Sequence, residues 1–433
     1  MPVIISSDKT QLTLFRAKSA YPIYLTIGNI PKAIRSKPTQ HAQLLMGYIP
    51  TTRLKHIKNK AAQRRALANL FHSCMCKVLS PIELYGETGI AMATGDGIWY
   101  RCHPILATFI GDYPEQCLVA CTQNGRCPKC MVPRDKIGDD TIFPSHDFGA
   151  AVDVFSLSDG NSIAFHMACC NASLKPIYHP FWESLPFTNI FVSITPDILH
   201  QLHQGVLKHM VRWLAALASN EIDMRSSRLP PNHNARHFHS GFTWLSKLTG
   251  QEHKDIARVL LGVVVNLALP SVQSSARLAR IVHALLDFIY LSQYLVHTTA
   301  SLNAMGAALC RFHEDKDVLI ELGVREHFKL PKLHSLLHYT RSIKLFGTAD
   351  NYNTEQSERL HIDFTKKAYC ASNFKDESKQ MTTWLERQEA VHWHATFIDW
   401  CKGGFPVLPT PSLAYPHCSG MTPRYDKPSL KVG

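Results

Sequence analysis

The chain has 433 residues, of which 45% are hydrophobic and 18% are charged, so we expect a globular fold with more than one lobe. No apolar run reaches the roughly 18 residues of a membrane-spanning helix, which argues against a membrane protein. The net charge is +12, from 46 Lys and Arg against 34 Asp and Glu, and it favours a polyanionic partner such as nucleic acid.

The first residues, MPVIISSDKTQLTLF, lack the basic and then apolar layout of a signal peptide. The 13 cysteines are odd in number and irregular in spacing. This pattern favours free thiols and a metal site in a reducing compartment over a disulfide framework.

The first 30 residues predict two or three antiparallel strands, because short β-rich runs alternate there with polar or small residues. A helix is expected over 53–79, and a further strand over 103–112, HPILATFIGD. Residues 132–185 are rich in Pro, Gly, Asp and Ser and predict a long surface loop with short elements.

A strand, NIFVSI, is expected at 189–194 and a helix after it, with Thr195 and Pro196 as its cap and first turn. From about 205 to 330 the pattern is helical, with a break at RLPPNHN. More helices are expected within 330–347, 351–373 and 381–400. Beyond Trp400 the chain is rich in Pro and Gly and predicts an extended tail.

The order of three strands, a helix, a strand and a later helix is that of a ribonuclease-H-like α/β fold with a mixed sheet. We therefore expect such a fold, interrupted by a large helical insertion. The expected parts are a first core segment with the zinc knuckle and loop (1–204), the insertion (205–330), a last core segment (331–400) and the tail (401–433).

A ribonuclease-H-like site uses three carboxylates around two divalent metal ions, and hard oxygen ligands suit Mg²⁺ or Mn²⁺. Asp8 follows the apolar VIISS, where an unpaired buried charge would be costly, and Asp112 closes the strand HPILATFIGD. Glu355 and Glu358 lie about one turn apart in NTEQSERLH and are candidates for the third carboxylate.

Each of these acids also has a simpler interpretation. An Asp at a strand end is commonly a turn former or a helix cap. Glu355 could answer the helix dipole in a first turn capped by Thr354 or Asn353. In TPDILHQ, Asp197 and His200 stand three apart at a helix start, either as a first-turn acid with its neighbour or as part of the active site.

Cys127 and Cys130 form a C-x-x-C knuckle in NGRCPKC, which supplies half of a tetrahedral zinc site. His334 and His338 in LHSLLH are four apart and can reach one ion from a single helix face. Two alternatives stay open: the histidines are polar residues of an amphipathic helix, or a local pair, Cys117 with Cys121 or Cys169 with Cys170, completes the site.

A basic stretch runs from Lys32 to Arg65 without a single acidic residue. Such a run is either a solvated face or a phosphate-binding surface. The candidate DNA-binding residues are Lys32, Arg35, Lys37, Arg53, Lys55, Lys58, Lys60, Arg64 and Arg65.

Long stretches of the chain resemble the Plavaka transposases of basidiomycete fungi, relatives of the CACTA group of cut-and-paste DNA transposases. The resemblance runs from about residue 1 to 400. It is carried by GDYPEQCLVACTQNGRCPKCMVPRD, NIFVSITPDILHQLHQGVLKH and LPKLHSLLHYTRSIKLFGTADNYNTEQSERLHID, among others.

This resemblance implies a ribonuclease-H-like catalytic domain with an Asp, Asp, Glu triad that cleaves and rejoins DNA at transposon ends. It places the first two acids at Asp8 and Asp112, and the family group's Asp-x-x-His signature at Asp197 and His200. The Glu-Arg pair of related transposases favours Glu358 over Glu355. A related recombinase pairs a C-x-x-C with two histidines shortly before the catalytic Glu, which supports a structural Zn²⁺ on Cys127, Cys130, His334 and His338.

The implied partners are transposon terminal inverted repeats and target DNA, the implied location is the nucleus, and a homodimer or higher oligomer is expected. Members of the family are usually longer and carry an N-terminal zinc-finger-like DNA reader, whereas this chain begins seven residues before Asp8. The alternative expectation is therefore a truncated or domesticated remnant that only binds DNA or another partner.

Overall fold

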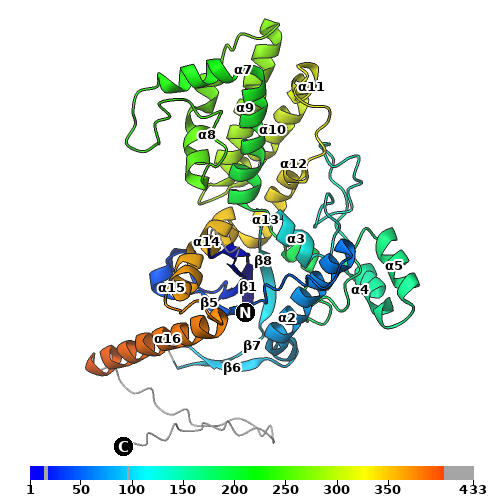
Figure 1. The fold of residues 1–433 in the computed structure, drawn as a ribbon, viewed down its shortest axis with the longest axis vertical. Helices are drawn as coiled ribbons and strands as arrows, with labels where there is room; N and C mark the ends of the chain where they lie inside the picture. Colours follow the sequence, from blue (N-terminus) through cyan, green and yellow to red (C-terminus); the bar gives the residue numbers. More distant parts are fainter. Residues whose placement is uncertain (14–17, 95–96, 404–433) are drawn as a thin grey trace, which may run out of the picture.

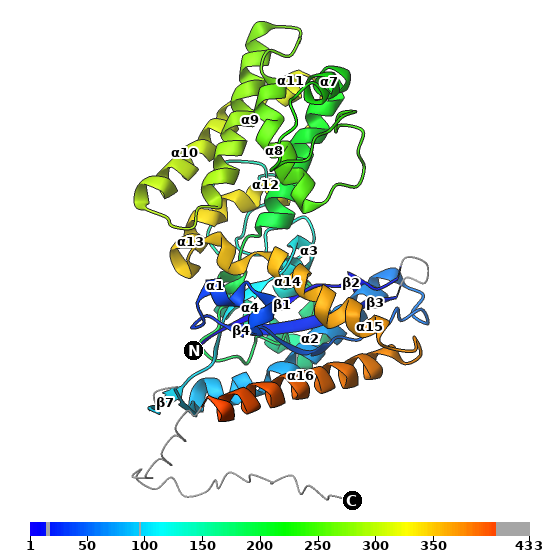
Figure 2. The same cartoon turned by 90° about the vertical axis from the view of Figure 1, so that its left-hand side faces the viewer.

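The computed structural model describes residues 1–13, 18–94 and 97–403. It is a mixed α/β protein built around a four-stranded mixed sheet (Figure 1). A group of long helices stands on one side of this sheet, and helix α16 lies on the opposite side (Figure 2).

The described strands are β1 (Pro2–Ser7), β2 (Thr10–Gln11), β3 (Ser19–Ala20), β4 (Pro22–Ile27), β5 (Leu44–Tyr48), β6 (Ile90–Ala93), β7 (Trp99–Cys102) and β8 (Ile105–Ile110). The helices of the first half are α1 (Lys32–Arg35), α2 (Lys60–Thr88), α3 (Tyr113–Val119), α4 (Phe148–Ser156), α5 (Ser162–Asn171), α6 (Ile190–Ser193), a π-type helix (Ile198–Leu207) and α7 (Lys208–Ser227). Those of the second half are α8 (Gly250–Val264), α9 (Val272–Ser292), α10 (Thr299–Asp315), α11 (Val318–Glu321), α12 (Pro331–His334), α13 (Tyr339–Phe346), α14 (Thr354–His361), a second π-type helix (Ile362–Lys367), α15 (Ala368–Cys370) and α16 (Glu377–Lys402).

The central sheet has the strand order β5-β4-β1-β8. β1 pairs antiparallel with β4, which pairs antiparallel with β5. β8 lies beside β1 in parallel, with Ser6 opposite Ile110. The strand expected at 103–112 therefore lies beside the first strand, as predicted.

The two faces of β1 belong to different apolar cores, because successive side chains of a strand point to opposite faces. Val3 and Ile5 pack in the core formed with α2, α4 and α5. Ile4 packs in the core of the long helices, together with Ile110 of β8. The sheet is thus covered by apolar cores on both faces.

The expected strand NIFVSI is wrong. Residues 190–193 form the short helix α6, and only a single bridge joins Ile194 to Phe109 of β8. The side chain of Asn189 accepts a hydrogen bond from the amide of Val192 and so caps this turn. Local capping and burial of Ile190 and Phe191 have prevailed over β propensity.

The expectation of a surface loop over 132–185 is also wrong in part. This segment contains α4 and α5, and Phe155, Phe165 and Trp182 are fully buried in the core beneath the sheet. The Pro and Gly residues correctly predicted turns. The aromatic side chains between these turns supply the apolar surface that packs the segment against the core.

Two helix starts differ from the prediction. The helix expected over 53–79 runs from Lys60 to Thr88, and the side chain of Asn59 caps it. The helix expected to begin at Thr195 and Pro196 begins at Ile198 with Asp197 as its cap, and its first ten residues have the wider π geometry. π-type segments often occur at functional sites.

Part of the expected strand QLTLF and residues 404–433 of the expected tail lie outside the described residues. Residues 401 and 402 belong to α16. The helices α7 to α11 fall within the segment predicted as an insertion, and the division at 204, 330 and 400 stays a prediction. Among the described residues, no helix combines the length and apolar character needed to cross a membrane.

Candidate acidic site and metal-binding cluster

The first two candidate acids lie at the ends of neighbouring parallel strands. Asp8 follows β1 directly, and Asp112 follows β8 by two residues. Because β1 and β8 run parallel, these ends meet at one edge of the sheet. The side chain of Asp8 is 33% exposed, so it is less buried than its apolar flank suggests.

Asp112 also caps α3, since its Oδ1 accepts a hydrogen bond of 2.9 Å from the amide of Glu115. Burial raises the pKa of Asp112, and the negative charge of Asp8 raises it further. His200 and Lys332 oppose this rise. The two acids are therefore electrostatic neighbours, and positive groups from the helices face them.

Asp197 and His200 form the next layer of the site. Asp197 is 1% exposed and accepts hydrogen bonds from the amide of His200 at 2.6 Å and from the amide of Thr354 at 2.9 Å. The hydroxyl of Thr354 donates to the same carboxylate at 2.8 Å. Asp197 thus ties the first π-type helix to α14, and its occupied oxygens favour a positioning role.

His200 bridges two carboxylates. Its Nδ1 lies 3.1 Å from Oδ2 of Asp197, and its Nε2 lies 3.1 Å from Oε1 of Glu358. Burial lowers the pKa of His200, but the hydrogen bonds and charges of Asp197 and Glu358 outweigh it and raise the pKa to about 10. His200 is therefore an imidazolium at neutral pH, and it links Asp197 to Glu358.

The two candidate glutamates differ in their surroundings. Glu355 forms an ion pair of 2.6 Å with Lys254 of α8. Glu358 instead contacts His200, whose charge also acts on Asp112. This geometry favours Glu358 as the third carboxylate. The helix cap is Asn353, one of the two residues considered from the sequence.

Glu115 is a candidate functional residue that sequence reasoning missed. It is 8% exposed and accepts hydrogen bonds from the hydroxyls of Ser7 and Tyr21. Burial raises its pKa to about 8, although those hydrogen bonds lower it, and the charges of Asp112 and Asp8 add to the rise. Its place in the first turn of α3 reads as an ordinary response to the helix dipole, so no sequence signal separates it from a surface acid.

The carboxylate oxygens of Asp8, Asp112 and Glu358 suit a hard divalent cation. Among the described residues, however, only the Cys/His group discussed next brings three or more possible ligand atoms within 4.8 Å of one another. The acids match Mg²⁺ in donor chemistry, but Glu358 is turned toward His200. Binding an ion between all three would require this carboxylate to change partner.

The knuckle and the histidine pair come together across about 200 residues of chain. Cys127 Sγ lies 3.2 Å from Nε2 of His338, and Cys130 Sγ lies 3.1 Å from Nε2 of His334. All four ligand atoms lie within 4.8 Å of one another. Two thiolates and two imidazoles at this spacing fit one tetrahedral zinc ion.

The local alternatives for this cluster do not join it. Cys121 is buried in another core, where its Sγ contacts His72 at 3.4 Å. Cys169 is buried in that same core and Cys170 is exposed. Hydrogen bonding from Cys127, and then from His334 and His338, lowers the pKa of the Cys130 thiol to about 2, which favours the thiolate form that binds metal.

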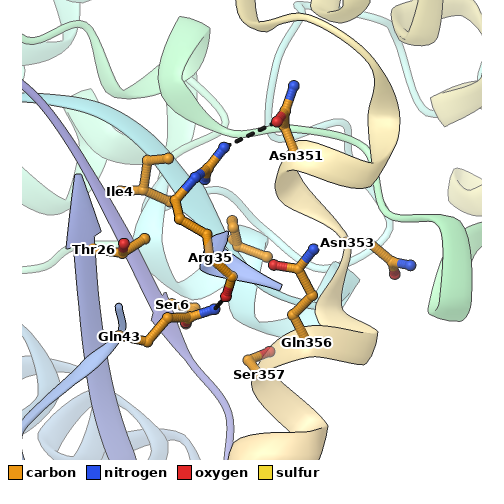
Figure 3. A pocket seen from close by; sticks show the side chains of 10 residues that line it. Ile4, Ser6, Thr26, Arg35, Gln43, Asn351, Asn353, Gln356 and Ser357 are labelled. Atoms are coloured by element: carbon orange, nitrogen blue, oxygen red, sulfur yellow. Dashed lines mark hydrogen bonds between the residues drawn. The ribbon is translucent and has the colours of Figure 1, made fainter. Parts of the chain in front are cut away.

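The basic stretch is only partly available to a partner. Arg35 is 6% exposed, and its guanidinium donates to Ile30 O and to Asn351 Oδ1 (Figure 3). The guanidinium of Arg35 thus joins α1 to the segment before α14, and its contact with DNA stays a prediction. Lys32 forms an ion pair of 3.0 Å with Asp350. The remaining candidates are exposed: Lys37, Arg53, Lys55, Lys58, Lys60, Arg64 and Arg65.

The fold and site define an α/β protein with an acidic cluster at the strand ends and a possible Cys/His metal site beside it. Residues 1–214 match the family model of the Plavaka transposase. This match confirms the resemblance drawn from the sequence over these residues. The family implies transposase activity, with DNA as the partner. A search of curated proteins found no match.

Glu115→Gln is expected to remove part of the pH dependence of stability. The pKa of Glu115 rises from 4.5 to about 8 on folding, so the native chain keeps a proton that the unfolded chain loses between these values. The free energy of unfolding of the wild type therefore falls as pH rises from about 5 to 8. The Gln variant, neutral throughout, should melt several degrees above the wild type at pH 8.5 and close to it at pH 5, in Mg²⁺-free buffer.

The exposed Glu326 supplies the matched control for this experiment. Glu326→Gln should leave the difference between the two pH values unchanged. His200 contributes equally to the stability of the wild type and the variants between pH 5 and 8.5, because each of them contains it, and its stabilising contribution is lost as pH rises through its folded-state pKa of about 10. Parallel melting curves for the wild type and Glu115→Gln across this range would contradict the buried, proton-retaining state of Glu115.

Cys127→Ala and His334→Ala are each expected to lose about one bound zinc per chain, because three remaining ligands rarely retain a structural ion. Elemental analysis of the purified proteins measures this loss. Melting temperatures should fall as well, since ligation free energy is also folding free energy. Cys170→Ala, at an exposed thiol, should retain the metal. Zinc that persists in His334→Ala would place the second half of the site elsewhere.

Proposed function

We propose that this chain is the catalytic part of a DNA transposase with a ribonuclease-H-like fold, and that Asp8, Asp112 and Glu358 are its acidic triad. The observation that carries the proposal is the meeting of Asp8 and Asp112 at the ends of parallel neighbouring strands. His200, whose charge acts on Asp112, also contacts Glu358, and this shared neighbour supports Glu358 as the third acid. The sheet order β5-β4-β1-β8, with β8 parallel to β1, supports the fold assignment. The family match over residues 1–214 supports the activity.

The proposed reaction has two steps. Water attacks a phosphodiester at the transposon end, the P–O3′ bond breaks, and a 3′-hydroxyl and a 5′-phosphate are left. That hydroxyl then attacks a target phosphodiester and releases a target 3′-hydroxyl. Two Mg²⁺ or Mn²⁺ ions on the triad oxygens would supply charge neutralisation at the attacking and leaving oxygens.

The protein groups have separate tasks in this proposal. Asp8 and Asp112 present oxygens from rigid strand ends, and Glu358 supplies a third from α14. His200 holds Glu358, and Asp197 holds His200. The Cys/His cluster, with Zn²⁺ as the proposed ion, fixes the knuckle after α3 to α12 and so keeps α14 near the strands. Loss of the knuckle would then abolish activity by disordering the site.

A second basic region supports DNA as the partner. Burial and the charges of Lys332, Arg212, Arg325 and Lys208 lower the pKa of His209 to about 4, so four cations gather around one imidazole. Lys332 also feels the charges of Asp112 and Asp197. Within the described part of the chain, Lys208, Arg212 and Lys332 make no ion pair with a carboxylate. Phosphates are the groups that would relieve this concentration of charge beside the acids.

The proposed cellular setting follows from this activity. A transposase acts on chromosomal DNA, so we propose a nuclear location and assembly as a homodimer or higher oligomer on paired transposon ends. The competing proposal is a remnant that binds DNA without cutting it. The two differ in whether purified protein nicks DNA.

Asp112→Asn and Glu358→Gln are expected to lower Mg²⁺- or Mn²⁺-dependent nicking and strand transfer by at least about 100-fold, because each removes a carboxylate ligand of the proposed metal ions, which neutralise charge at the reacting phosphate. Glu355→Gln should retain most activity, since Glu355 pairs with Lys254 instead. The assay uses DNA carrying candidate terminal repeats, with unrelated DNA as the control. Wild-type protein that binds the repeats but never nicks them would favour the non-catalytic remnant. If Glu355→Gln lost as much activity as Glu358→Gln, the assignment of Glu358 as the third acid would be contradicted.

Lys208→Ala, Arg212→Ala and Lys332→Ala are each expected to weaken DNA binding and to reduce the slope of log K against log salt by about 0.9, since each contact releases one counterion. Fluorescence anisotropy without divalent ions measures this slope. Lys379→Ala, at an exposed residue of α16, is the matched control. Lys55→Ala tests the sequence-predicted stretch in the same way. Unchanged slopes in all three cluster variants would remove this surface from the DNA interface.

A further inference from the structure

The imidazole of His361 is buried between a tyrosine and the first candidate acid. His361 is the last residue of α14 and is 3% exposed. Its Nδ1 lies 2.9 Å from the hydroxyl oxygen of Tyr24, and its Nε2 lies 3.5 Å from Oδ2 of Asp8. Three segments distant in sequence therefore meet at this ring: β4, the end of β1 and α14.

Nε2 of His361 is buried and has no conventional hydrogen-bond partner among the residues that the structure describes, and the group that it faces is the Asp8 carboxylate. Buried polar atoms are nearly always satisfied, so an orphan aimed at a candidate catalytic group calls for an explanation. The backbone at this position is bonded as well, because the hydroxyl of Thr365 donates to the carbonyl oxygen of His361. Thr365 lies in the second π-type helix, which begins directly after His361.

For a neutral ring, the two contacts determine which nitrogen carries the proton. If Nδ1 carried the proton and donated it to the oxygen of Tyr24, the lone pair of Nε2 would face Oδ2 of Asp8. Two hydrogen-bond acceptors would then face each other without a proton between them, which is unfavourable. If the hydroxyl of Tyr24 donates to Nδ1, the proton lies on Nε2 and points at Asp8. Tyr24 is only 1% exposed, so water does not reach its hydroxyl group. In this arrangement Nδ1 of His361 accepts the hydroxyl proton of Tyr24. The second arrangement satisfies every group.

On the basis of the proposed function, we propose that His361 and Tyr24 are positioning residues for Asp8. Tyr24 fixes the ring tautomer, and His361 directs Nε2–H at Oδ2 of Asp8, which holds that carboxylate at the strand end. Glu358 and His361 lie three apart on α14, so one helix turn supplies the third acid and the group that orients the first. Any movement of α14 then moves both together.

Groups that orient a metal-binding carboxylate change metal affinity or activity by roughly 10- to 100-fold when they are removed. His361→Leu, which keeps bulk but has no donor, is therefore expected to raise the Mn²⁺ concentration for half-maximal nicking by about that factor. His361→Gln places an amide donor near the position of Nε2 and should recover most of this loss. Tyr24→Phe removes only the tautomer control and should cause a smaller shift.

Two measurements do not depend on nicking. In the metal-free protein, ¹⁵N-histidine spectra should show one signal that disappears in His361→Gln and that has the shifts of a neutral ring protonated at Nε2. Electron paramagnetic resonance of free Mn²⁺ should show weaker binding to His361→Leu than to the wild type, without DNA. His253→Leu, at a buried histidine of α8, is the matched control for general destabilisation, and it should change neither the His361 signal nor Mn²⁺ binding.

The outcomes separate this inference from the proposed function. An Nε2-protonated ring with weaker Mn²⁺ binding in His361→Leu and rescue by His361→Gln supports the positioning role. A ring protonated at Nδ1, or wild-type Mn²⁺ dependence in His361→Leu, overturns it even if the wild type nicks DNA. A wild type that never nicks DNA defeats the proposed function, while the spectra still report the tautomer.

Discussion

The buried carboxylate of Asp197 is the interaction on which the arrangement of the site depends. It accepts hydrogen bonds from the start of the first π-type helix, at His200, and from the start of α14, at Thr354. Burial alone raises the pKa of Asp197, but His200 and the amides outweigh it and keep the group ionised. An ionised, fully bonded carboxylate in the interior is costly to disrupt, because breaking one partner leaves a buried charge unpaired. Two helices 150 residues apart are thereby held at a fixed distance.

The Cys/His cluster also connects two segments that are distant in sequence, and the distance along the chain is larger. Cys127 and Cys130 lie just after α3, and His334 and His338 lie just before α14. The chain between them includes the long helices. Asp197 and the cluster each connect the segment before the long helices to the segment after them. A long helical region can thus be placed between the acids of one site without separating them.

The parts of the site that sequence could predict are those set by local spacing. The C-x-x-C knuckle and the H-x-x-x-H pair each define half of a tetrahedron, and ligand chemistry alone suggests that the halves meet. Asp8 and Asp112 could be brought together because strand order in a mixed sheet is a topological rule. Glu115 and Arg35 could not be predicted in this way, because their burial is decided by tertiary neighbours: Ser7 and Tyr21 for the acid, Asn351 for the arginine. The strand expected at NIFVSI failed for the same reason, since side chains that favour β structure can also fill a core from one turn of helix.

Three carboxylates of the site face a cation, and the others indicate where a metal ion would act. Asp197 and Glu358 share His200, and Glu355 pairs with Lys254. Asp8 faces Nε2 of His361. Among the described residues, Asp112 and Glu115 have no cation in contact, and burial raises the pKa of both. These two lie together at the first turn of α3, beside the end of β1. A divalent ion arriving there would relieve the least compensated carboxyl groups first, and its charge would then compete with His200 for Glu358. The histidine that holds the third acid in the free protein would thus release it only when that ion is in place.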